Sequence, residues 1–299
     1  MKKNAFTLAE VLIVMALIGF LFTLMLPTLV QKQSSTKYIE SLKTAQDKLQ
    51  TALDMTAKDN HNLPPQDWPS VRVSENKSDA IMKELAKHLQ IMSYCGNSSK
   101  GCFSQKTYRT LNGKNTSVIT DDMDPNTQTI TKDEYSESDF SNQDETGWEE
   151  VSQEPQWEYT EALPEFSSTY VSLLDGGAVV LKTNSTKCDR LLLSTDTLER
   201  PVCGIFYVDV NGQAIPNMLG VDVFGFYLSN NSIIPMGFYG DDFAFDYNCL
   251  RETPRARKTN GLGCTAWALK NRNMEYRKCQ AGTRIGWTKD TRCDAQPTK

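Results

Sequence analysis

Glu10 is the first residue whose type and position suggest a chemical role. It is the only ionisable side chain in the run from Ala5 to Val30. A carboxylate within the apolar end of a membrane helix costs on the order of 2.5–3.5 kcal/mol, so such residues usually have a partner. We therefore regard Glu10 as a functional residue that needs a partner charge.

The eight cysteines are the next candidates, for disulfides or for a metal site. The chain has no C-x-x-C pair, and its histidines, His61 and His88, are far from most cysteines, so disulfides are favoured over zinc. Disulfides persist in a periplasm or outside the cell, which predicts that location for this part of the chain. The cysteine order invites pairing of nearest neighbours, but sequence alone cannot choose the connectivity. The cysteines are Cys95, Cys102, Cys188, Cys203, Cys249, Cys264, Cys279 and Cys293.

Three oxygen-bearing side chains, Asp209, Asn211 and Asp222, surround a glycine-containing loop. Calcium accepts carboxylates, amides and carbonyls, so these residues are a candidate calcium site. The alternative is a turn, in which Asn211-Gly212 supplies positive φ and Asp209 bonds local amides. The turn is favoured because no complete D-x-[DN]-x-[DN]-G-x5-E loop is present. No cofactor is required by the sequence.

Catalytic motifs are not found in the sequence. It contains no G-x-S-x-G elbow, no H-E-x-x-H helix and no G-x-x-x-x-G-K-[ST] loop. The acid pair Asp241-Asp242 follows a glycine, where adjacent carboxylates more often face solvent. We therefore expect no enzyme, although the two acids of a carboxylate hydrolase can be distant along a chain.

The element that must position Glu10 is the N-terminal segment. Val11 to Val30 are twenty uncharged residues, close to the ~20 that cross a bilayer as a helix. A cleaved secretory signal is disfavoured, because its apolar core is roughly 7–15 residues long and ends in an A-x-A-like site. A plain signal anchor would leave Glu10 unexplained. Lys2 and Lys3 place the N-terminus inside the cell by the positive-inside rule.

The run AFTLAEVLIVMALIGF, which begins at Ala5, resembles the N-terminus of type IV pilins and of type II secretion pseudopilins. The resemblance covers about the first thirty residues. It implies cleavage between Ala5 and Phe6 by a prepilin peptidase, followed by N-methylation of Phe6. Residue 5 departs from the family pattern, in which glycine usually precedes the cut, and this implies slower processing.

The resemblance also assigns roles within the helix. Glu10 would neutralise the α-ammonium group of Phe6 on the adjacent subunit and so set the register of stacking. Pro27 falls where such helices are often kinked, since proline removes a helical hydrogen bond. The implied partners are other pilins or pseudopilins, the prepilin peptidase and the inner-membrane assembly platform. No nucleic-acid partner is predicted.

Beyond Pro27 the helix should continue as an amphipathic segment over residues 31–60. Its apolar residues recur at steps of three and four, and Asn62 to Pro65 should break it. A second helix is expected from Ser78 to Met92. The stripe residues of the first helix are Tyr38, Leu42, Ala45, Leu49 and Ala52.

Strand-like runs follow at 169–174, 178–183, 204–210 and 224–228, and their short connections predict antiparallel pairing. Asp175-Gly176-Gly177 reads as a hairpin turn between the first two. The expected fold class is α+β. A long N-terminal helix, with a transmembrane half and an amphipathic half, packs on an antiparallel sheet in a disulfide-stabilised head, as in pilins.

Charge is distributed unevenly along the chain. Residues 121–165 hold fifteen acidic residues and one basic residue, a net charge of −14, and read as an exposed, largely disordered insertion. Calcium capture or attraction of a basic partner are functional alternatives to a solvated loop. Residues 251–299 have a net charge of +8. Because cysteines interleave these basic residues, a solvated face is favoured over a nucleic-acid site.

The sequence thus predicts four parts: a leader (1–5), a transmembrane helix segment (6–30), an amphipathic continuation (31–60) and an extracytoplasmic head (61–299). The expected function is a minor pilin or pseudopilin of a type IV pilus or type II secretion filament. It would be a single-pass inner-membrane protein whose head lies in the periplasm, or on the cell surface after assembly. The alternative is a membrane-anchored periplasmic binding protein or hydrolase that does not polymerise.

Overall fold

The structure is a computed structural model. The predicted leader, Phe6 and the acidic insertion 121–165 lie outside the residues that it describes. Within helices and strands, only the backbone is described at 10, 21–33, 190–192, 200, 283–284 and 294–295. The described residues are 8–120, 167–183, 188, 190–192, 200–238, 241, 243–251, 258–279, 283–287 and 293–295.

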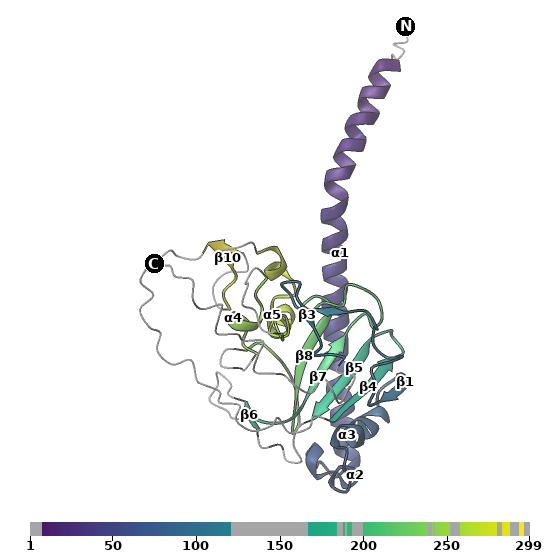
Figure 1. The fold of residues 1–299 in the computed structure, drawn as a ribbon, viewed down its shortest axis with the longest axis vertical. Helices are drawn as coiled ribbons and strands as arrows, with labels where there is room; N and C mark the ends of the chain where they lie inside the picture. Colours follow the sequence, from purple (N-terminus) through teal and green to yellow (C-terminus); the bar gives the residue numbers. More distant parts are fainter. Residues whose placement is uncertain are drawn as a thin grey trace, which may run out of the picture.

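Helix α1 spans Leu8–Asp59 and ends beside the predicted boundary at residues 59–60. Its C-terminal part packs along the head, while its N-terminal part projects away from it (Figure 1). The apolar stripe makes the contact, because Leu42, Leu49 and Ala52 are at most 1% exposed. Residues spaced by three and four share one face of a helix, which explains why this stripe is buried as a unit.

The head is built around a seven-stranded antiparallel sheet with the strand order β1-β4-β5-β7-β8-β9, in which β6 also pairs with β7. The α+β class and the antiparallel pairing predicted from the sequence are confirmed. The strands are β1 (Ile91–Gly96), β4 (Ser167–Leu173), β5 (Ala178–Thr183), β6 (Arg190–Leu192), β7 (Arg200–Asp209), β8 (Val223–Ser229) and β9 (Ile233–Pro235).

Both faces of this sheet are covered, so strand β5 is buried at every position. Alternate side chains of a strand point to opposite faces. Val179 and Leu181 therefore join the cluster that contains α1, whereas Ala178 and Val180 join a second cluster with Phe103. A strand buried on both sides reads as a continuous apolar run, as AVVL does here.

The predicted helix from Ser78 to Met92 is wrong in its second half. Helix α3 spans Lys77–Ala86, and the chain then enters β1, where Met92 is 71% exposed. Pairing of β1 with β4 provides backbone hydrogen bonds that local helix propensity does not offset. Two short helices, η1 (Pro65–Asp67) and α2 (Pro69–Arg72), connect α1 to α3.

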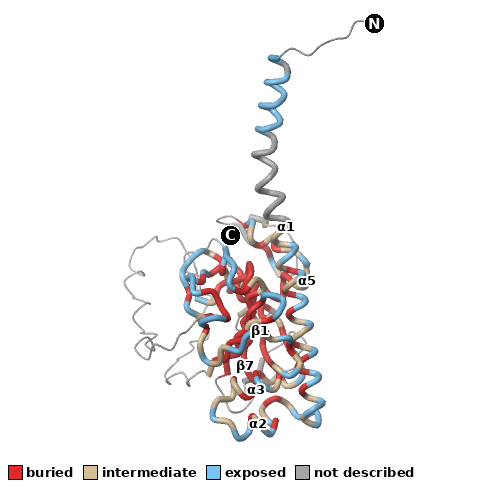
Figure 2. Tube along the Cα trace, turned by 90° about the vertical axis from the view of Figure 1, so that its right-hand side faces the viewer, coloured by how far each residue is buried: buried red, intermediate tan, exposed pale blue. Residues whose placement is uncertain are grey.

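The remaining elements pack around the sheet and beside α1 (Figures 1 and 2). Buried residues fill the space between the helices and the strands (Figure 2). The elements are the hairpin β2 (Tyr108–Arg109) with β3 (Asn115–Thr116), the helices α4 (Phe245–Asn248), α5 (Cys264–Asn271) and η4 (Glu275–Lys278), and the hairpin β10 (Thr283–Arg284) with β11 (Asp294–Ala295).

Candidate functional site

The projecting end of α1 carries exposed apolar side chains. Leu8, Leu12, Ile13, Met15 and Phe20 are each more than half exposed. Figure 2 shows this end of the helix as an exposed rod outside the head. Exposed apolar surface of this extent marks an interaction site in a protein or membrane environment.

The processing residues Ala5 and Phe6 lie outside the described residues. Glu10 and Pro27 lie within α1, but their side chains are not described. The predicted processing, register and kink therefore remain predictions. Among the described residues, no helix combines the length and the apolar character that a membrane span requires.

Polar contacts hold α1 to the head at several points, including Thr56 with the Glu84 carbonyl and Asp59 with His88 near its C-terminal end. Three more lie between Ser35 and Gln50. Arg277 Nη1 donates a hydrogen bond to Ser35 Oγ at 3.1 Å, where the helix enters the head. Further along, Lys48 forms an ion pair with Asp175 in the turn between β4 and β5. This pair is partly exposed, so it contributes at most about 1 kcal/mol and mainly fixes orientation.

The third contact is made by Gln50. Its Oε1 accepts a hydrogen bond from the backbone N–H of Ile233 at 2.8 Å, and its Nε2 donates to the carbonyl of Asn231 at 3.1 Å. One side chain thus satisfies a backbone group in the connection between β8 and β9 and another at the first residue of β9. No sequence signal predicted this role, because Gln50 lies on the helix beside many other polar residues.

The candidate calcium residues cluster where β7 and β8 meet the loop between them. Asp209 pairs with Val223 across the two strands, and Val210 N–H donates to the carbonyl of Asp222. Asp209 and Asp222 are completely buried. The structure therefore brings together two carboxylates that are thirteen positions apart in sequence.

Each carboxylate accepts hydrogen bonds from neighbouring groups. Asp209 Oδ2 accepts from the Tyr108 hydroxyl at 2.9 Å, and its Oδ1 accepts from the Asn211 N–H at 3.2 Å. Asp222 accepts from the N–H groups of Asn217 and Met218 at 2.9 and 2.7 Å. Tyr108 and Asn217 were not singled out in the sequence, where nothing indicates that they meet the two acids.

Burial raises the pKa of both acids. Burial, together with the charge of Asp222, raises the pKa of Asp209 well above its usual value. Burial raises the pKa of Asp222 to about 6, opposed by the N–H groups of Met218 and Asn217. Burial and the charge of Asp222 also raise the pKa of Tyr38 on α1.

The described residues do not fit a calcium site. Calcium takes 6–8 oxygen ligands, whereas the carboxylate oxygens of Asp209 and Asp222 already accept N–H and O–H donors. Within the described part of the chain, no group of three or more acidic, histidine or cysteine side chains could hold a metal ion. Gly212 has φ +62°, as the turn interpretation requires. We assign no metal to this loop.

Asp241, the described member of the predicted acid pair, is not solvent-facing. Its side chain accepts hydrogen bonds from the Tyr227 hydroxyl and from the N–H groups of Gly237 and Phe243. Burial raises its pKa. These bonds to neighbouring backbone groups give Asp241 the role of organising the loop that follows β9.

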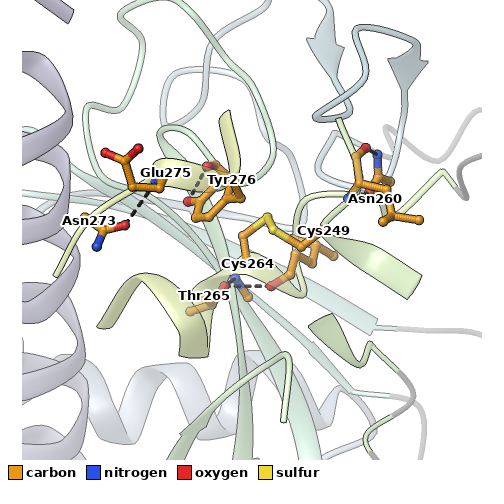
Figure 3. The surroundings of a disulfide bond; sticks show 11 residues. Cys249, Asn260, Cys264, Thr265, Asn273, Glu275 and Tyr276 are labelled. Atoms are coloured by element: carbon orange, nitrogen blue, oxygen red, sulfur yellow. Dashed lines mark hydrogen bonds between the residues drawn. A yellow bond between two sulfur atoms is a disulfide. The ribbon is translucent and has the colours of Figure 1, made fainter. Parts of the chain in front are cut away.

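Four disulfides link nearest neighbours in sequence: Cys95–Cys102, Cys188–Cys203, Cys249–Cys264 and Cys279–Cys293. The predicted disulfide-stabilised head is confirmed. Figure 3 shows how Cys249–Cys264 ties the first residue of α5 to the end of α4, below Tyr276. The Tyr276 hydroxyl donates to the Gly220 carbonyl at 2.8 Å, which connects this region to the loop that carries Asp222.

Comparison with known proteins identifies one end of the chain. Residues 1–26 match the family model described as the prokaryotic N-terminal methylation motif, the signature of type IV pilins and pseudopilins. No curated protein and no solved structure matches the chain. The resemblance predicted from the sequence is confirmed for this segment. The motif implies a protein that is anchored in a membrane or assembled on the surface.

Proposed function

We propose that this chain is a structural subunit, a minor pilin or pseudopilin, that assembles into a filament through α1, and that it is not an enzyme. The observation that carries this proposal is the projecting, apolar end of α1, which begins inside the matched methylation motif. Such a surface is stable only when lipid or other apolar helices cover it. A membrane covers it before assembly, and neighbouring copies cover it within a filament.

Glu10 sets the register of this assembly. Peptidase cleavage after Ala5 exposes the α-ammonium group of Phe6, and the carboxylate of Glu10 on a neighbouring subunit neutralises it. An unpaired carboxylate at this depth costs on the order of 2.5–3.5 kcal/mol, so pairing favours one axial position over all others. A subunit that carries Glu10 is suited to a position in the filament where another subunit lies above it.

The head presents a surface while α1 assembles. Polar contacts and the buried stripe fix α1 to the head, so a force applied to the helix reaches the head. The head, residues 61–299, is large for a major pilin, which supports a minor or specialised subunit. The filament belongs to a type IV pilus or to a type II secretion system.

Processing is tested by measuring the mass of the mature N-terminus from cells with and without the prepilin peptidase. We expect the protein to begin at a methylated Phe6 only when the peptidase is present. A protein that retains Met1 in both strains would contradict the processing step. Ala5→Gly should accelerate cleavage, because glycine is the residue that usually precedes the cut in this family.

Assembly is tested with Glu10→Ala in the native system. We expect the variant to insert in the membrane and to disappear from the sheared filament fraction. Glu40→Ala is the matched control, because Glu40 is an exposed acid on the part of α1 that packs on the head. If Glu10→Ala enters filaments at the level of the wild type, the register argument fails, and a tethered protein that never polymerises becomes the better account.

A further inference from the structure

One surface of the head is basic and lies at the end from which α1 projects. It comprises the exposed residues Lys100, Lys106 and Arg109 with the adjoining loop 213–216, and we call it the α1-proximal surface. Figure 1 shows β3, the strand that pairs with β2 (Tyr108–Arg109), in the half of the head nearer the projecting part of α1. The assembly role of α1 does not use this surface.

Contacts place the loop beside the point where α1 enters the head. Tyr38 of α1 packs against the same hydrophobic cluster as Val210 and Met218, which flank the loop. Asn211 Nδ2 donates to the Ile215 carbonyl at 3.2 Å, and Gln213 Nε2 donates to the Gly101 carbonyl at 2.8 Å. The loop is therefore bonded to Gly101, the residue next to Lys100.

The charge of this surface is of one sign. From residue 93 to residue 120 the sequence contains four basic residues and no acidic residue. Among the ion pairs formed by described residues, none involves Lys100, Lys106 or Arg109. Solvated cations clustered on one side of a domain create a positive potential that attracts anions within about a Debye length, ~8 Å at physiological salt.

The loop adds an apolar element. Ile215 is 67% exposed and is followed by exposed Pro216, while the exposed residues of the loop carry no charge. Apolar side chains next to lysines and arginines are typical of surfaces that lie in the interfacial region of a membrane. A purely acidic partner would bind the cations but would gain nothing from Ile215.

We propose that the α1-proximal surface rests on anionic phospholipid headgroups while the subunit waits in the membrane for assembly. This inference depends on the membrane anchoring in the proposed function. If the span ends at Val30, then Tyr38 lies about 12 Å further along a helix that rises ~1.5 Å per residue. The surface around Tyr38 is therefore within reach of the headgroups, which also orient the head before it enters a filament.

The expected strength follows from the number of cations. Each lysine or arginine near an anionic membrane surface contributes about fivefold in affinity, the equivalent of ~1 kcal/mol. With three cations, docking should be strong at low salt and weak at high salt, because salt screens exposed charges. Vesicles of neutral lipid should show no docking of this surface.

The test uses the full chain, reconstituted with its heads outward in vesicles of phosphatidylcholine alone or of phosphatidylcholine with phosphatidylglycerol. Lysine acetylation is mapped by mass spectrometry after flotation of the vesicles. We expect about fivefold lower acetylation of Lys100 and Lys106 in the anionic vesicles, lost at high salt. Lys83 on α3 and Lys87, the residue that follows this helix, are the control, because both are exposed and α3 lies at the other end of the head (Figure 1).

Arg109→Gln supplies an independent check. It removes one cation from an exposed position, so protection of Lys100 and Lys106 should weaken while the control lysines do not change. Equal acetylation of Lys100 and Lys106 in the two kinds of vesicle would overturn the proposal. A chain that fails to float with either vesicle would contradict the membrane anchoring itself, and with it this proposal.

Discussion

The buried pair Asp209 and Asp222 predicts that the head loses stability as pH rises. Asp222 titrates near pH 6 in the folded protein against a reference of 3.8. A raised pKa means that ionisation costs more in the folded state than in the unfolded state. The stability contributed by the protonated form is therefore complete below about pH 4 and is lost as pH rises through 6.

The magnitude follows from the size of the shift. About two pKa units at 1.36 kcal/mol each correspond to a loss of about 3 kcal/mol between pH 4 and pH 7. Burial and the charge of Asp222 also raise the pKa of Asp209, so ionisation of either carboxyl group costs stability in the folded state. Other carboxylates oppose the trend: hydrogen bonds and ion pairs with lysines lower the pKa of Glu84 and of Asp175.

Comparison with Asp222→Asn isolates the effect. The variant cannot ionise at this position, but its amide leaves one of the N–H groups of Asn217 and Met218 without an acceptor, so it should be less stable at pH 4. The assay is urea unfolding of the full chain in detergent, followed by tryptophan fluorescence between pH 4 and pH 7. We expect the stability advantage of the wild type to shrink by about 3 kcal/mol as pH rises. An advantage that is constant or grows with pH would refute this reasoning.

Three further substitutions test the head by the same unfolding measurement. Gln50→Ala should cost about 1–3 kcal/mol, because the buried N–H of Ile233 loses its acceptor; no change would show that water replaces the side chain. Gly212→Ala should destabilise the head far more than Gly113→Ala. Both glycines have positive φ, but only at Gly212 would a Cβ meet the backbone of another segment. Equal losses of stability would show that the positive φ, and not this close contact, accounts for the cost. Trp267→Ala should cost about 3–5 kcal/mol, because the ring is 1% exposed within an aromatic cluster, and a loss below 1 kcal/mol would contradict the packing.

The strands show which secondary structure could be predicted from local sequence and which could not. The hairpin predicted around Asp175-Gly176-Gly177 is present, because both flanking runs have strand propensity and Gly176 adopts positive φ. The predicted helix through Met92 fails, because its apolar spacing suits a helix while its place beside β4 makes it a strand. Long-range pairing can override local preference when the two are close in free energy.

The cysteines and the loop that carries Asp209, Asn211 and Asp222 show the same contrast between local sequence and tertiary structure. The eight cysteines predict a disulfide-stabilised head, but only the fold brings each sulfur to its partner. Asp209, Asn211 and Asp222 suggested a calcium site on residue type alone. In the structure Tyr108 and several backbone N–H groups occupy the carboxylate oxygens, and Tyr108 comes from a segment about a hundred residues away.

By itself, the sequence determined the N-terminal motif, the apolar character of the segment around Glu10, the amphipathic stripe of α1 and the α+β class. These features are encoded by neighbouring residues, whose spacing and polarity act locally. The tertiary structure alone decided which cysteines pair, that Gln50 and Arg277 join helix to head, and that two distant carboxyl groups share one buried site. Such contacts depend on residues far apart in the chain, and their free energy exists only after the sheet and α1 have packed together.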